Sequence, residues 1–87
     1  MEFEWDTAKE ASNFEKHGIS FVAAAELLDS KHYATRSDRQ GEERYFAIGE
    51  LHDLVTVVIY TKREGKYRII SARRASKNEE ATYRAHS

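Results

Sequence analysis

Hydrophobic positions recur at helical spacing in the first third of the chain and alternate as in strands thereafter. Glu2–Trp5 alternates over a short stretch, which predicts an amphipathic strand. Asp6 follows as a good N-cap residue, and the helix that it begins is predicted over Thr7–His17, with Gly18 as the left-handed residue that ends it. A second helix is predicted over Phe21–Leu28, because its apolar residues recur every three to four positions.

From residue 31 the pattern is that of strands separated by turns. Leu54–Tyr60 is the strongest strand, since it is β-branched and apolar on both faces. Such a strand is central, and it is either covered on both sides or covered by helices on one side and by a partner on the other. The other predicted elements are strands at His32–Thr35, Glu43–Ile48 and Lys66–Ala72, turns at 37–42, 49–53 and 62–65, and a polar closing helix at Lys77–His86.

The last predicted strand ends in two arginines and runs directly into a helix start. Ser76 and Glu79 match a capping box, in which the serine caps the helix and the glutamate reaches back to it. If the strand is regular, its residues alternate between two faces, so that Arg68 and Arg73 point to opposite sides. The two sets are Ile69, Ser71 and Arg73 on one face, and Arg68, Ile70, Ala72 and Arg74 on the other.

These elements predict one α+β domain of 87 residues. We expect a small, mostly antiparallel sheet of four or five strands, with the two N-terminal helices on one face and a short C-terminal helix. The chain has no cysteine, its acidic start does not resemble a signal peptide, and no apolar run approaches the ~20 residues of a membrane span. We therefore expect a cytoplasmic protein without a membrane partner.

A net charge of −1 conceals a strong asymmetry along the chain. Residues 1–30 carry seven acidic and two Lys or Arg residues, whereas residues 62–87 carry three acidic and eight Lys or Arg residues. Such an asymmetry suggests an anionic partner for the basic part. The alternative is a dipolar domain whose two halves neutralise each other in the fold.

Several short motifs, taken in order, resemble the BrnT family of toxins from bacterial type II toxin–antitoxin pairs. The resemblance covers about residues 2–80. Its motifs are Phe3-Glu4-Trp5-Asp6, Lys9, Asn13, Lys16-His17-Gly18-Ile19, Phe21, Gly41-Glu42-Glu43-Arg44, Ile48-Gly49 and Arg68-Ile69-Ile70-Ser71-Ala72-Arg73-Arg74-Ala75.

The resemblance implies a RelE-like fold and an endoribonuclease activity that arrests growth. It also implies neutralisation by a BrnA-type antitoxin, whose ribbon-helix-helix domain binds operator DNA and represses the operon. The toxin would then meet DNA only through the antitoxin. Because ribbon-helix-helix domains dimerise, we expect a hetero-oligomer that holds two or more toxin chains.

A ribonuclease that works without a metal ion must activate the 2′-hydroxyl, stabilise the charge of the phosphorane and protonate the leaving oxygen. Arg73 is the candidate for stabilising that charge, because a guanidinium can meet two phosphate oxygens at once. The alternative for Arg73 is a salt bridge to Glu4 or Asp6. Arg44 is a further catalytic candidate, which either pairs with the neighbouring acids or reaches across the sheet toward Arg73. Arg68 and Arg74 are candidates for binding RNA.

One face of the first predicted helix carries Lys9, Asn13, Lys16 and His17, at positions i, i+4, i+7 and i+8. These positions match the BrnT motif, and they suggest a face that binds phosphate, with Lys16 and His17 as catalytic candidates. The alternative is a solvated face on which Lys16 and His17 complement the helix dipole.

The remaining residues limit the other chemistries. The histidines are scattered and no cysteine is present, so no metal site and no cofactor is expected. Trp5 can stack on a base, although its position beside Phe3 favours a role in the core. The competing hypothesis for the whole chain is a module of the same fold that binds RNA or protein without cutting.

Overall fold

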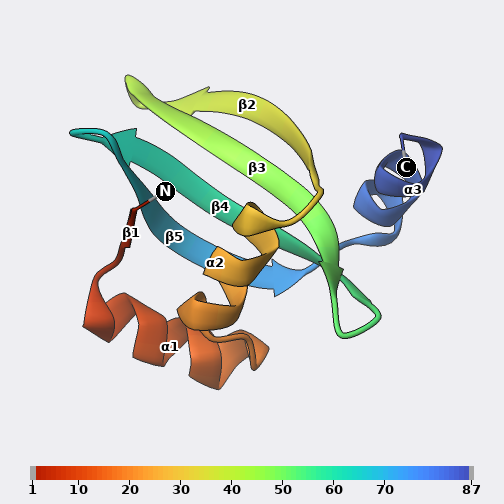
Figure 1. Cartoon of the computed structure of the whole chain (residues 1–87), viewed down its shortest axis with the longest axis horizontal. Coiled ribbons are helices and arrows are strands. Elements are labelled where there is room, and N and C mark those ends of the chain that lie inside the picture. Colours follow the sequence, from red (N-terminus) through yellow and green to blue (C-terminus); the bar gives the residue numbers. More distant parts are fainter. Residues whose placement is uncertain (1, 87) are drawn as a thin grey trace.

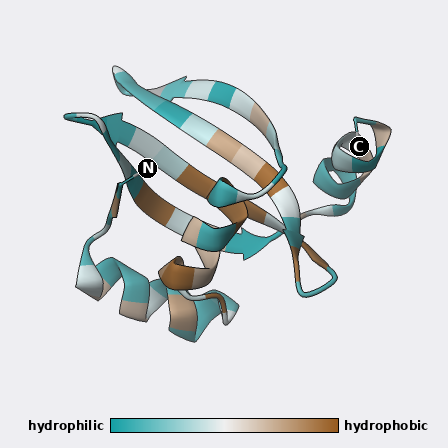
Figure 2. Ribbon diagram, in the orientation of Figure 1, coloured by the Kyte–Doolittle hydropathy of each residue, from teal (hydrophilic) through white to brown (hydrophobic). Residues whose placement is uncertain are grey.

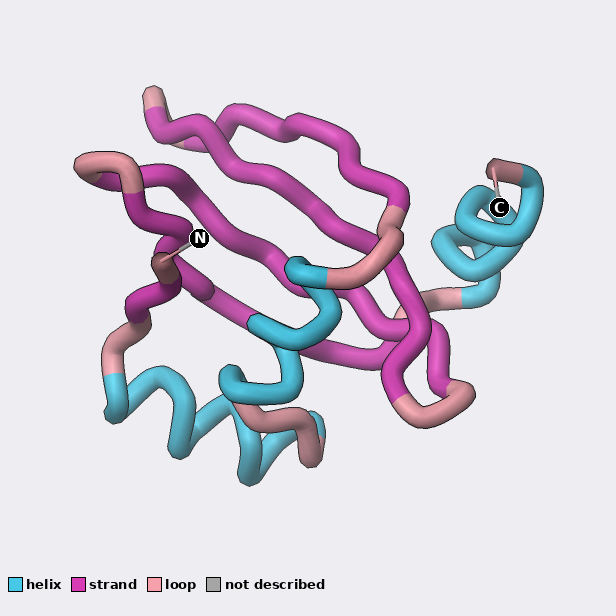
Figure 3. Tube along the Cα trace, viewed as in Figure 1, coloured by secondary structure: helices cyan, strands magenta, loops and turns pink. Residues whose placement is uncertain are grey.

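The structure is a computed structural model that describes residues 2–86, without the side chain of Arg39. Figure 1 shows the arrangement of its three helices and five strands, and Figure 3 shows the loops that join them. The elements in chain order are β1 (Phe3–Glu4), α1 (Thr7–His17), α2 (Phe21–Asp29), β2 (Tyr33–Arg39), β3 (Glu42–Leu51), β4 (Leu54–Arg63), β5 (Lys66–Arg74) and α3 (Lys77–Ala85).

The five strands form one sheet in the order β1-β5-β4-β3-β2. Strands β2 to β5 are an antiparallel meander, as predicted, whereas β1 pairs with β5 in parallel and makes the sheet mixed. α2 lies over one face of the sheet, which we call the helix side, and α1 lies on the same side along the edge formed by β5 (Figure 1). α3 packs against residues of the opposite face, which we call the outer face. The predicted α+β class is confirmed.

The predicted turns are in the right places but are too wide. Each hairpin turns over two residues whose φ angles are both positive, as in a type I′ turn, and the strands continue up to these residues. The turning residues are Gln40-Gly41, His52-Asp53 and Glu64-Gly65. Gly49 belongs to β3 and not to a turn. A Cβ atom at Gly49 would lie 3.1 Å from Cγ of Leu27, so this glycine lets α2 approach the sheet.

The predicted helix caps are confirmed. The carboxylate of Asp6 accepts hydrogen bonds from the backbone N–H groups of Ala8 and Lys9, and Gly18 ends α1 with a φ of 73°. At α3, Ser76 and Glu79 form both hydrogen bonds of the capping box.

Apolar residues of β4 contribute to the core clusters on both faces of the sheet, as expected of a central strand. Figure 2 colours part of this strand brown, as hydrophobic. On the helix side, Phe21 and Leu27 of α2 are fully buried against the sheet. On the outer face, Tyr83 of α3 packs against a smaller cluster of Ile48, Val55 and Val57. α3 therefore covers part of the face that the sequence left open to a partner.

A β-bulge in β5 overturns the predicted alternation of its residues. Tyr60 of β4 pairs with Ile69, but the next residue, Ile59, pairs with Ser71, so that Ile70 is an extra residue. Arg68 then lies opposite Thr61, and Arg73 lies opposite Val57. Because these two partners share one face of β4, the register puts Arg68 and Arg73 on the same face of the sheet. The expectation of opposite faces assumed a regular strand and is wrong.

Candidate functional site

Three arginines gather on the outer face of the sheet. Arg68 and Arg73 belong to this face by their register with β4, and Arg44 belongs to it because it alternates with Phe46 and Ile48 along β3. Arg44 and Arg68 stand two strands apart, about 10 Å, and Arg73 lies about 13 Å further along β5 from Arg68. We call Arg44, Arg68 and Arg73 the outer-face arginines.

Each outer-face arginine pairs with a carboxylate. Arg68 donates to Glu4 at 2.8 Å across the β1–β5 pair, and Arg44 donates to Glu42 at 3.3 Å on its own strand. The sequence left open whether Arg44 would pair with a neighbouring acid or reach across the sheet. In the structure it pairs with the neighbouring Glu42. The alternative considered for Arg73 was a salt bridge to an N-terminal acid such as Glu4 or Asp6, and the structure does not have it, because Arg73 pairs with Glu79.

Arg73 instead binds Glu79 at the start of α3. Its Nη1 and Nη2 atoms lie 2.8 and 2.9 Å from the two carboxylate oxygens. The hydrogen bond from Arg73 lowers the pKa of Glu79 from 4.5 to about 2. The same bond raises the pKa of Arg73. The pair is therefore fully ionised at neutral pH.

An apolar floor lies between the outer-face arginines. Phe46 and Ile59 are only half-buried there, because α3 covers the sheet further along. Between α3 and the sheet lies a hollow of 230 Å³, lined in part by Phe46, Ile48 and Glu79. A half-exposed ring beside guanidinium groups is a surface on which an unstacked base can lie. Sequence reasoning missed Phe46, although its place in an alternating strand was visible.

A second group of cations lies at the free edge of β5, beside α1. Lys9, Lys16 and His17 line an open hollow of 220 Å³ together with Ser71 of β5. All three side chains are exposed, and in the described part of the chain none of them forms a salt bridge. We call Lys9, Lys16 and His17 the edge cations. The structure brings them together with Ser71 and not with Arg73.

Asn13, on the same face of α1, has a partner for each of its polar atoms. Its Oδ1 accepts from the N–H of Ala72 and from the hydroxyl of Ser71, and its Nδ2 donates to the carbonyls of Ala72 and Ile19. The carboxamide thus pairs with β5 where β1 has ended, as a neighbouring strand would. This position explains Asn13 by the fold, with no need of a ligand.

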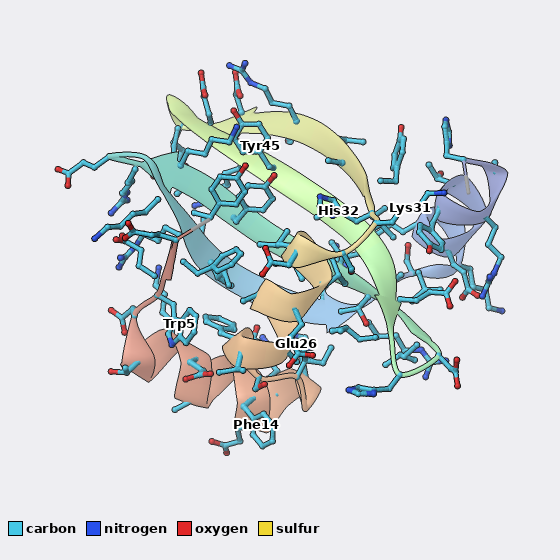
Figure 4. All side chains as sticks on the ribbon, in the orientation of Figure 1. Trp5, Phe14, Glu26, Lys31, His32 and Tyr45 are labelled. Carbon is cyan, nitrogen blue, oxygen red and sulfur yellow. The ribbon has the colours of Figure 1, made fainter. Side chains whose placement is uncertain are left out.

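Arg74 and a row of tyrosines lie on the helix side, away from Arg73. Arg74 pairs with Thr56 in the register and is exposed. Tyr60 stacks between Tyr45 and Tyr67, with ring centroids 5.2 and 5.1 Å away (Figure 4 labels Tyr45). Their phenols therefore belong to the face opposite the outer-face arginines.

Trp5 is part of the core. Its ring meets Phe21 edge-on at 6.1 Å, between the end of β1 and the helices. By contrast, Phe14 of α1 is 54% exposed and points away from the sheet (Figure 4). Phe14 lines a hollow of 270 Å³ at the corner between α1 and α2.

Residues 2–86 contain no group of three or more His, Cys, Asp or Glu side chains that could hold a metal ion. None of the three helices has the length and the apolar character that a bilayer crossing requires.

Comparison with known proteins identifies a class of toxin. The family model described as "Ribonuclease toxin, BrnT, of type II toxin-antitoxin system" matches residues 5–79. A crystal structure of the Brucella abortus ribonuclease toxin BrnT superposes with a TM-score of 0.69 at 30% sequence identity, over 88% of this chain and 99% of that one. Among curated proteins, none matches the chain.

The fold and the two matches agree on a ribonuclease toxin of a type II toxin–antitoxin system. The chain belongs to the BrnT family, as its sequence motifs suggested. A toxin of this type has an antitoxin as its partner.

Proposed function

We propose that this toxin cuts RNA without a metal ion, on the outer face of its sheet. The observation that carries the proposal is the gathering of the three outer-face arginines around a half-exposed apolar floor. Guanidinium groups stabilise the charge that develops on a phosphorane, and the floor supports an adjacent base. Arg73 is the proposed catalytic residue, with Arg44 and Arg68 binding the neighbouring phosphates.

In the proposed reaction the 2′-oxygen attacks the adjacent phosphorus, and the bond from phosphorus to the 5′-oxygen breaks. The proton of the 2′-hydroxyl leaves to a base, and the leaving oxygen takes up a proton. The products are a 2′,3′-cyclic phosphate and a 5′-hydroxyl end. The edge cations, with Arg74, would hold the flanking RNA backbone, because exposed lysine and arginine side chains bind phosphate without fixed geometry.

The test is cleavage of total cellular RNA by the purified toxin in EDTA, with wild type and Arg73→Ala compared at equal concentration. We expect wild type to release cyclic-phosphate ends and Arg73→Ala to be strongly impaired while still folded. RNA that is bound but not cut by wild type would instead support the non-catalytic binding module. Cleavage that needs added Mg²⁺ would contradict the metal-independent reaction.

We also propose that a BrnA-type ribbon-helix-helix antitoxin neutralises the toxin and holds two or more toxin chains. The matching family model supports an antitoxin partner, and the sequence motifs support its type. Size-exclusion chromatography of the toxin with the candidate antitoxin tests this proposal. We expect a common peak at a larger mass, and an unchanged elution volume for the toxin would contradict it.

A further inference from the structure

The guanidinium of Arg73 is held along one of its two donor edges. Nη1 and Nη2 donate to Oε1 and Oε2 of Glu79, and Nη1 also donates to the backbone oxygen of Arg74 at 3.3 Å. Oε1 of Glu79 accepts in addition from the N–H of Ser76, at 2.8 Å. The carboxylate is therefore fixed by the first turn of α3, and it fixes the guanidinium in turn.

The other donor edge of Arg73 is free. A guanidinium carries five N–H bonds in one plane. The N–H bond of Nε is parallel to one N–H bond of Nη2, and these two bonds form the second donor edge. Within residues 2–86, Nε of Arg73 has no acceptor, and the only acceptor of Nη2 is Glu79. The side chain as a whole is 29% exposed, and it is therefore not sealed inside the core. Two parallel N–H bonds match two oxygens of a phosphate.

We propose that Glu79 is a positioning residue for RNA cleavage, which grips one edge of the Arg73 guanidinium so that the opposite edge meets the scissile phosphate. This inference rests on the proposed function, and it adds a residue that does not itself touch RNA. The low pKa of Glu79 keeps this carboxylate ionised, and so able to accept from Arg73, at neutral pH.

The alternative role for Glu79 is that of a shield, by which we mean a carboxylate that neutralises Arg73 and whose salt bridge must break before RNA binds. The two roles predict opposite results when the carboxylate is removed. A positioned guanidinium stabilises the phosphorane more than the bound phosphate, so that its loss of orientation lowers kcat and leaves KM nearly unchanged. A shield, once removed, would leave Arg73 free and increase both RNA affinity and the rate.

Glu79→Gln is the informative variant, with Glu80→Gln as its control. Glutamine also completes a capping box, so α3 keeps its N-terminal cap while Arg73 loses the two-oxygen partner. Glu80 binds Arg84 within the same helix, and its substitution makes the same charge change away from Arg73. We expect Glu79→Gln to lower kcat about 10- to 100-fold, and Glu80→Gln to match wild type.

A double-mutant cycle with Arg73→Ala separates positioning from a general loss of stability. All variants are assayed below their thermal midpoints on one short RNA substrate in EDTA. If Glu79 acts through Arg73, the double variant is no slower than Arg73→Ala alone. Independent losses that multiply, or a Glu79→Gln enzyme as fast as wild type or faster, would overturn the inference.

The same assay distinguishes failure of the inference from failure of the proposed function. If Arg73→Ala cleaves RNA slowly while Glu79→Gln cleaves it as fast as wild type, the positioning role alone is excluded. Wild type that does not cut RNA in EDTA removes the proposed function, and the positioning role with it.

Discussion

The outer-face arginines and the edge cations are both positively charged, but they differ in whether a carboxylate pairs with them. Each outer-face arginine is held by a carboxylate on a strand or on α3, within 2.8 to 3.3 Å. The edge cations have no such partner in the described chain, and they stand exposed around an open hollow. One group has fixed directions and little net charge, whereas the other has net charge and free side chains.

This difference separates two tasks in handling RNA. Stabilising a transition state requires donors that are already oriented, because reorientation during the reaction costs free energy. Attracting a flexible polyanion requires only unneutralised charge, whose effect is long-ranged and weakened by salt. The outer face suits the first task and the edge suits the second.

Removing one oriented donor should abolish most of the activity, whereas removing edge cations should not. We expect Arg73→Ala to lower kcat about 10²- to 10³-fold, as is typical for the loss of one transition-state donor. At saturating RNA, Lys16→Ala/His17→Ala should retain a kcat within about threefold of wild type, because these residues only hold the substrate. Single-turnover cleavage of a short RNA gives both values.

The reverse ranking would contradict the division. A Lys16→Ala/His17→Ala variant that is folded but inactive, beside a nearly normal Arg73→Ala, would move the chemistry to the edge of β5.

Asn13 lies among the edge cations, but its hydrogen bonds to β5 lead us to expect a structural role. Asn13→Ala leaves the edge of β5 unpaired, and we expect the free energy of unfolding to fall by about 2 kcal/mol. Urea denaturation measures this loss, with Ser12→Ala, an exposed neighbour on α1, as the control. An Asn13→Ala variant that is as stable as wild type but binds RNA poorly would restore Asn13 to the RNA-binding residues.

The Arg73–Glu79 pair should be visible in the pH dependence of stability. The pKa of Glu79 is lowered in the folded state, so its ionised form stabilises the fold above pH ~4.5 and this contribution is lost as the pH falls toward 2. At pH 7 we expect the free energy of unfolding of wild type to exceed that of Glu79→Gln by about 1–2 kcal/mol, a figure that allows for the partial exposure of the pair.

The difference in unfolding free energy between these two proteins should shrink steadily below pH 5. Urea denaturation at pH 7, 5, 4 and 3 measures it. A difference that stays constant over this range would contradict a stabilising role of the ionised Glu79 carboxylate.

The smallest expected effect concerns RNA affinity at the edge. Lys9→Ala/Lys16→Ala removes two charges, so the slope of log K against log salt should decrease in magnitude by about 1.4 for a single-stranded RNA. Fluorescence anisotropy with a non-cleavable 2′-O-methyl RNA measures the slope. Lys31→Ala, near the β2 edge of the sheet, is the control that changes charge at the opposite side. An unchanged slope in the double variant would exclude a role of the edge in binding.

The sequence predicted the helices and the class of fold because their signals are local. Asp6, Gly18 and the Ser76–Glu79 box mark helix ends by hydrogen bonds to residues within one turn. The strand ends were harder to predict, since Gly49 looks like a turn residue until Leu27 is known to pack against it. That contact joins residues that are distant in the sequence.

The site was predicted by residue type more successfully than by geometry. Arg44, Arg68 and Arg73 are all candidates from the sequence, but the bulge at Ile70 decides that Arg68 and Arg73 share a face. No local pattern marks that bulge, because it follows from the register between β4 and β5. The partner of Arg73 was missed for the same kind of reason. Glu79 had been assigned to the helix cap, and a capping glutamate gives no sign in the sequence of a second hydrogen-bond partner.

The most direct test of the account is to map where RNA binds. Amide chemical shifts of the ¹⁵N-labelled toxin are recorded during titration with a short 2′-O-methyl RNA, which cannot be cut because its 2′-hydroxyl is blocked. We expect the largest shift changes on the outer face, at Arg44, Ile59 and Arg73, with smaller changes along α1. Changes confined to α1 and the helix side, with an undisturbed outer face, would contradict it.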